Sequence, residues 1–172
     1  MKQGAVSGCV KERMFRSYLE IWRYELEHSR VMASSFMVST DNAQSAHPNH
    51  MEKSDAVNRP FMNEGIVIKY NANQRYTSDA VSSAIFKVIC EKAKVPYQVY
   101  VNRSDIAGGS TLGNIAGTQI SMNTVDIGLA QLAMHSSYET AGTKDTEYLV
   151  KAARQFFECD IQCAEDGIFA LR

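Results

Sequence analysis

The stretch IVIKYNANQRYTSDAVSSAIFKVICEKAKVPYQVYV, residues 66–101, decides the fold. Its two ends, residues 66–71 and 97–101, are short apolar runs rich in β-branched and aromatic residues, which favour strands. Between them, through residues 81–89, apolar side chains recur at three- and four-residue steps, as on one face of a helix. Pro96 marks the end of that helix, because a proline cannot continue it. A strand, a helix and a strand in this order predict a parallel crossover unit within a layered α/β domain.

Elements on both sides extend this unit. They are a long helix, a buried strand, a fourth strand and a closing helix, which occupy residues 10–33, 35–39, 124–128 and 144–157. The long helix carries an apolar stripe, which we expect to pack against the core. The members of the stripe are Met14, Phe15, Tyr18, Leu19, Trp22 and Leu26. Together these elements predict a layered α/β/α domain with a mostly parallel or mixed sheet.

The composition limits the classes of function. The chain has 172 residues, a hydrophobic content of 45% and a net charge of -1, so nothing favours binding to nucleic acid. No apolar run approaches the roughly 20 residues of a membrane span, and the N-terminal residues lack a secretory segment. Four scattered cysteines predict free thiols, and Cys159 and Cys163 lack a second pair that would complete a zinc knuckle. We therefore expect a cytoplasmic protein without nucleic-acid or membrane partners.

Three residues stand where α/β sheets carry functional groups. Asp41 ends an apolar run, as acids do at the carboxyl ends of strands in open α/β sheets, and His135 follows the predicted strand at 124–128. The two residues could share a metal site, although an Asp here is often a turn former and a His is often structural. Lys69 interrupts the alternation of its strand, and the simplest interpretation is a stem snorkelling from a sheet edge. Because a catalytic zinc needs at least three protein ligands, the residues alone predict at most a partial site.

Residues 103–119, RSDIAGGSTLGNIAGTQ, form a glycine-rich connection. Its spacing is neither that of a P-loop nor that of a dinucleotide fingerprint, which argues against phosphate binding. The adjacent Gly108 and Gly109 predict an exposed turn before Ser110. The free N–H groups of such a turn can bind a carboxylate or an oxyanion.

Four long segments together resemble one known family. They are SSFMVSTDNAQSAHPNH (34–50), NRPFMNEGIVIKYNANQRYTSDAVSSAIF (58–86), VNRSDIAGGSTLGNIAGTQISMNTVDIGLAQLAMHSSYETAG (101–142) and KDTEYLVKAARQFF (144–157). In this order they resemble the C-terminal part of the aspartyl aminopeptidase family, which includes the vacuolar aminopeptidases. The resemblance covers residues 1–158 as the C-terminal part of a metallopeptidase catalytic domain and leaves residues 159–172 as a weakly patterned tail.

The resemblance implies a two-zinc exopeptidase that removes N-terminal, typically acidic, residues from peptides and works as a homo-oligomer. By motif, Asp41 matches the ligand of one zinc ion and His135 the ligand of the other. Both also face the substrate, together with Lys69 and Tyr76, which match substrate-contacting positions. Gln44 stands where a substrate-touching histidine is usual, and it keeps a hydrogen-bond donor without the charge.

The family's general-base glutamate and its other zinc ligands match no residue of this chain, so no catalytic residue is assigned here. We therefore expect an incomplete piece of a metallo-aminopeptidase that is inactive alone. The alternative is a non-catalytic subunit that assembles with complete relatives.

Overall fold

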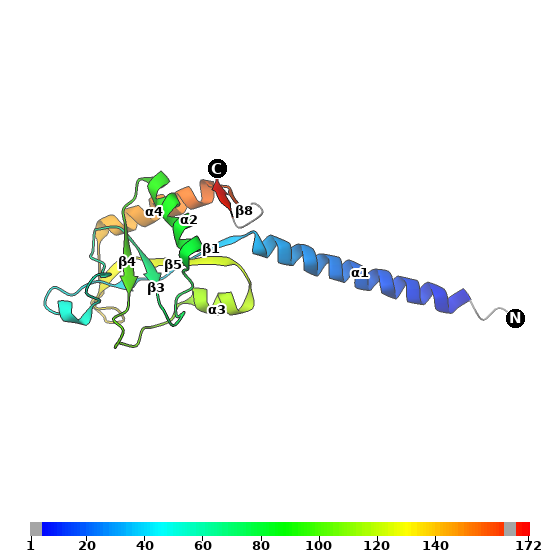
Figure 1. Ribbon diagram of the computed structural model, residues 1–172, viewed down its shortest axis with the longest axis horizontal. Coiled ribbons are helices and arrows are strands. Elements are labelled where there is room, and N and C mark those ends of the chain that lie inside the picture. Colours follow the sequence, from blue (N-terminus) through cyan, green and yellow to red (C-terminus); the bar gives the residue numbers. More distant parts are fainter. Residues whose placement is uncertain (1–4, 164–167) are drawn as a thin grey trace.

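The computed structural model describes residues 5–163 and 168–172 and is built around a four-stranded sheet (Figure 1). The strand order is β1 (Phe36–Thr40), β5 (Asn123–Gly128), β3 (Ile66–Tyr70) and β4 (Tyr97–Val101). β1 runs parallel to β5 and β3 parallel to β4, whereas β3 and β5 are antiparallel. The predicted crossover is confirmed, since α2 (Ala80–Ala93) joins the parallel strands β3 and β4. The sheet is mixed, as the prediction allowed.

Alternation along β3 sorts its side chains between two layers. Ile66 and Ile68 pack in the main core with α2 and with α4 (Thr143–Glu158). Val67 points to the opposite face and packs with a smaller cluster that includes Ala43 and Ala130. Helix α3 (Leu112–Gln119) covers part of this second face, where the Gly113 N–H donates to Ser39 Oγ on β1. The sheet therefore lies between helices, as Figure 1 shows.

Smaller elements complete the described chain. β2 (Ala43–Gln44), β6 (Ala130–Leu132) and β7 (Thr140–Ala141) form a three-stranded sheet, and a 3-10 turn, η1, spans Met51–Lys53. Residues 159–172, expected as a weakly patterned tail, contain the antiparallel pair β8 (Ile161–Cys163) and β9 (Phe169–Leu171). Side chains of both strands pack against the main core.

Helix α3 lies within residues 103–119, a glycine-rich connection for which the sequence predicted no helix. The signal was weak because α3 contains two glycines and lacks a side-chain cap, and glycine disfavours helices by about 1 kcal/mol relative to alanine. Close packing holds α3 instead. A Cβ added to Gly113 would lie 2.6 Å from Ser39 Oγ, so glycine is what lets the helix approach β1.

Helix α1 (Ala5–Ala33) projects away from the rest of the chain (Figure 1). The expectation that its apolar stripe packs against the core is wrong for Leu19, Trp22 and Leu26, and Trp22 is 74% exposed. Met14, Phe15 and Tyr18, the other members of the stripe, have side chains that lie outside the described ones. The spacing predicted an apolar face correctly, but spacing does not specify what covers it.

The cysteines that the structure describes are free, as expected. Cys90 is buried in the main core, and burial raises the pKa of its thiol to about 12. Cys159 is partly exposed, while the side chains of Cys9 and Cys163 lie outside the described ones. In the described part of the chain, no helix has the length and apolar character needed to cross a membrane.

Asp145, at the start of α4, ties that helix to the loop before β3. Its carboxylate is fully buried and accepts hydrogen bonds from the Asn63 N–H at 2.6 Å and the Gly65 N–H at 2.9 Å. An asparagine can accept only one of these bonds, so we expect Asp145→Asn to lower the free energy of unfolding by about 1–2 kcal/mol. Urea denaturation measures this, with the exposed Glu158→Gln as the control. Equal stability of the two variants would contradict the anchoring role.

Candidate functional site

A cavity of about 320 Å³ opens beyond the end of β1. The five residues that the sequence singled out all line it, and they are Asp41, Gln44, Lys69, Tyr76 and His135. Strand pairing explains how distant segments meet there. The Asp41 N–H donates to the Ile127 carbonyl at 2.9 Å, and β2 then continues the pairing alongside β6. The chain around Asp41 and the chain that leads to His135 therefore run side by side.

Lys69 is the buried cation of this cavity. It is 1% exposed on the inner strand β3, so the interpretation as a side chain snorkelling from a sheet edge is wrong. Its Nζ donates to the carbonyls of Asp41 at 2.9 Å and Asn42 at 3.4 Å, and it lies 3.5 Å from Asp41 Oδ2. Burial lowers the pKa of the Lys69 ammonium, an effect that the carboxylates of Asp41 and Asp126 oppose. Lys69 thus holds the turn after β1 in place.

Asp41 lies at the mouth of the cavity with its side chain 60% exposed. Among the described residues, its carboxylate contacts Lys69 and makes no capping bond to a backbone N–H, which favours a ligand over a turn former. The backbone here passes very close to β5. A Cβ on Gly128 would lie 1.8 Å from the Asp41 carbonyl oxygen, so only glycine leaves room for the chain.

His135 reaches the same cavity from the loop after β6. Its backbone adopts the left-handed conformation with φ of 66°, and its N–H donates to Glu139 Oε1 at 2.7 Å. This bond fixes the loop without using the imidazole, whose nitrogens make no protein hydrogen bond within the described residues. Because His135 is exposed, water can satisfy both nitrogens, and they are available to a ligand.

Tyr76 forms the buried wall of the cavity. Asp126, which the sequence analysis did not single out, positions it through the neighbouring Thr77. The Tyr76 ring lies 5.0 Å from Lys69 Nζ, and burial raises the pKa of its hydroxyl to about 12. The next residue, Thr77, donates from its N–H at 2.6 Å and its Oγ1 at 2.8 Å to the fully buried Asp126. The available signal was an acid inside the apolar strand TVDIG.

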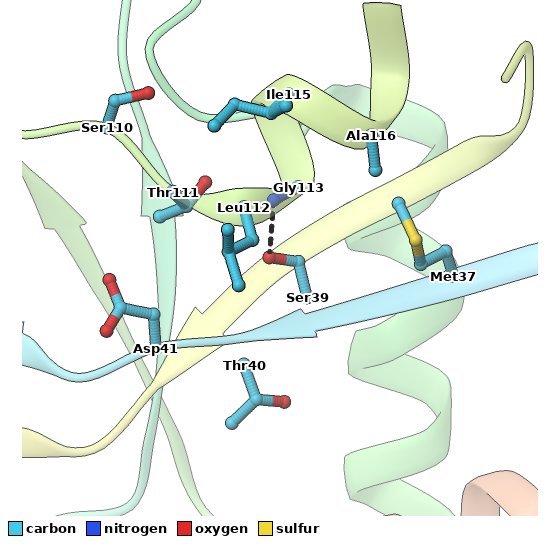
Figure 2. A pocket seen from close by; sticks show the side chains of 10 residues that line it. All are labelled: Met37, Ser39, Thr40, Asp41, Ser110, Thr111, Leu112, Gly113, Ile115 and Ala116. Carbon is cyan, nitrogen blue, oxygen red and sulfur yellow. Dashed lines mark hydrogen bonds between the residues drawn. The ribbon is translucent and has the colours of Figure 1, made fainter. Parts of the chain in front are cut away.

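A second cavity, of about 470 Å³, adjoins the first and opens between β1 and α3 (Figure 2). Asp41 and Ser110 line both cavities. Gly109 and Ser110 line the first cavity, so the glycine-rich connection borders the candidate site. Most of the second cavity is walled by apolar side chains of β1 and α3, among them Met37, Leu112 and Ile115.

The donors fit one part of a zinc site. A carboxylate and an imidazole are both zinc ligands, and Asp41 and His135 line one cavity. Across residues 5–163 and 168–172, no group of three His, Cys, Asp or Glu side chains could hold a metal ion. Since a zinc ion needs three protein ligands or more, the described residues alone do not complete a site.

Comparisons with known proteins agree on one family. The family model described as aminopeptidase I zinc metalloprotease (M18) matches residues 1–157. A probable M18 family aminopeptidase 2 of Clostridium acetobutylicum is 45% identical over 156 residues, which cover 91% of this chain and 36% of the relative. The chain thus spans about a third of the length of that relative.

Solved structures of similar proteins carry the same fold. The structure of a complex of Ape4 and Nbr1 matches with a TM-score of 0.74 and 42% identity, over 76% of this chain and 25% of the other. The dodecamer of mApe1 from S. cerevesiae matches with a TM-score of 0.68 and 28% identity, over 76% of this chain and 28% of the other.

Proposed function

Because the chain belongs to the M18 family of aminopeptidase I zinc metalloproteases, we propose that its 320 Å³ cavity is part of a two-zinc site that removes N-terminal acidic residues from peptides. One observation carries the proposal. Asp41, Gln44, Lys69, Tyr76 and His135 are scattered along the sequence and line one cavity. They are the residues that the family resemblance assigns to zinc and substrate.

Each residue has a role in this proposal. Asp41 holds one zinc ion and His135 the other, and the bound metals supply an activated water for peptide hydrolysis. Lys69 favours an acidic side chain of the substrate, because a cation in a buried cavity attracts a carboxylate strongly. Of its three contacts, the 3.5 Å contact to Asp41 Oδ2 is the longest, and a substrate carboxylate can replace it. Tyr76 and Gln44 line the remaining wall.

The general base and the other zinc ligands are assigned to no residue of this chain. We expect the 172-residue protein to release negligible aspartate from an aspartyl peptide with added zinc or manganese. The missing residues can be supplied by a chimaera in which this chain replaces the matching 156-residue segment of the C. acetobutylicum relative. We expect the chimaera to hydrolyse an aspartyl peptide. A folded chimaera that binds zinc and lacks activity would contradict the proposal. Turnover by the chain alone would contradict the assignment of the general base to residues outside this chain.

A second candidate function is that of a non-catalytic, cytoplasmic subunit, for which the projecting α1 is the specific observation. A helix that exposes apolar side chains suits assembly with other chains, and the mApe1 relative is a dodecamer. According to this hypothesis, the chain is a subunit of an oligomer whose other subunits are full-length relatives. Co-elution with the full-length relative in size-exclusion chromatography tests it, and separate elution at all mixing ratios counts against it.

A further inference from the structure

Two residues of the loop before α2, Thr77 and Ser78, fasten that loop to the inner strand β5 at Asp126. The Asp126 N–H donates to Ser78 Oγ at 2.9 Å, and Ser78 Oγ donates to the Asp126 carbonyl at 3.3 Å. The Asp126 carboxylate accepts from the Thr77 N–H at 2.6 Å and from Thr77 Oγ1 at 2.8 Å. We call these four hydrogen bonds the Asp126 clip.

Burial makes the bonds to the Asp126 carboxylate important. Asp126 is fully buried, and both bonds from Thr77 end on its Oδ2 atom. The other oxygen, Oδ1, has no hydrogen-bond partner among the described residues. Hydrogen bonds to a charged group stabilise more than those between neutral groups, and a buried charge that loses its donors is costly. The carboxylate therefore holds Thr77 firmly in one place.

Tyr76, the residue before the clip, is fixed at both ends. Its backbone continues into Thr77, and its hydroxyl donates to Asn102 Oδ1 at 3.3 Å. Between these ends, the ring lies 5.0 Å from Lys69 Nζ, a distance typical of a cation–π contact. Tyr76 is only 8% exposed, so its ring shields one side of the Lys69 ammonium from water.

Shielding from water decides how strongly an ammonium attracts a carboxylate. The attraction between two charges falls about fourfold when the effective dielectric constant rises from about 20 to about 80. A Tyr76 ring that moved away would admit water to Lys69 and weaken its attraction for an acidic side chain. The position of the ring therefore affects selectivity although the ring carries no charge.

We propose that Asp126 is a positioning residue for the selection of acidic substrates, because its carboxylate, through Thr77, holds the Tyr76 ring against the Lys69 ammonium. The inference rests on the proposed function, in which Lys69 attracts the acidic side chain of the substrate. Asp126 is not among the residues that line the cavity, so it acts on a substrate only through its neighbours.

Thr77→Val tests the clip, because valine keeps the branched shape and the backbone N–H and removes only the hydroxyl bond to Asp126. In the chimaera, we expect this variant to lower the ratio of kcat/KM for an aspartyl peptide to kcat/KM for the asparaginyl peptide about tenfold. Thr77→Ser keeps the hydroxyl and should restore the ratio to within about twofold. Thr146→Val, the same change at an exposed position of α4, is the control.

Two other roles of the clip would give different results. The Asp126 charge also acts on Lys69, but Thr77→Val leaves that charge in place, so a change in the ratio reports on the position of the ring. If the clip only stabilises the loop, Thr77→Val should lower kcat/KM for both peptides equally. An unchanged ratio would therefore overturn the proposal.

The contact between the Tyr76 ring and Lys69 can be measured directly in the 172-residue chain by NMR. We expect a nuclear Overhauser effect between the two side chains in the wild type and in Thr77→Ser, and its loss in Thr77→Val. Its absence from the wild type or its persistence in Thr77→Val would overturn the proposal. An unsubstituted chimaera that hydrolyses both peptides equally well would instead contradict the proposed role of Lys69, and the NMR result would still show whether the clip holds the ring.

Discussion

Asp41→Asn in the chimaera is expected to lower kcat/KM for an aspartyl peptide at least about a thousandfold, or about 4 kcal/mol of transition-state stabilisation. Asparagine keeps the size of the side chain and removes the charge that a zinc ion requires. The backbone at position 41 should not move, because the shortest Lys69 contact and the Ile127 contact use the carbonyl and the N–H of Asp41. The loss therefore reports on the carboxylate itself.

Zinc content, measured by mass spectrometry, separates a lost ligand from a lost fold. We expect Asp41→Asn and His135→Gln each to reduce the bound zinc, and the double variant to be scarcely less active than either single variant, as for residues that act as one unit. Glu147→Gln, on the exposed face of α4, is the control and should keep full activity. An Asp41→Asn chimaera with more than about a tenth of the original kcat/KM would remove Asp41 from the metal site.

The sequence predicted the elements whose period was clear. The crossover unit within residues 66–101 was found with its two strands and its helix, whose N-cap is Asp79. The Asp79 carboxylate accepts a hydrogen bond from the Ser82 N–H at 2.7 Å, and the Ser82 hydroxyl accepts one from the Asp79 N–H. A capping box of this kind can be predicted from the sequence, because its two partners are only three residues apart.

Features that depend on distant partners were not predictable. The burial of Lys69 follows from β3 being an inner strand, which no local pattern reveals. Helix α3 exists because Gly113 packs on Ser39. Of the stripe on α1, the described members Leu19, Trp22 and Leu26 are exposed, although their spacing predicted burial. The candidate site was found through the family resemblance, since only the pairing of β1 with β5 and of β2 with β6 brings Asp41 and His135 together.

Lys69→Met in the chimaera is expected to lower kcat/KM about a hundredfold for an aspartyl peptide and less than about threefold for the matching asparaginyl peptide. Methionine preserves the length and the burial of the side chain and removes its charge. The preference for the acidic residue should collapse, because the buried ammonium is the only cation among the described residues that line the cavity. Lys151→Met, an exposed lysine on α4, is the control.

The contacts of Lys69 also define the result that would contradict this role. If the ammonium serves only to hold the turn through the carbonyls of Asp41 and Asn42, its loss should slow both peptides equally. It should then also lower the free energy of unfolding, because two carbonyls lose their donor. Parallel measurement of the two kcat/KM values and of urea denaturation therefore distinguishes a residue that selects acidic substrates from one that positions Asp41.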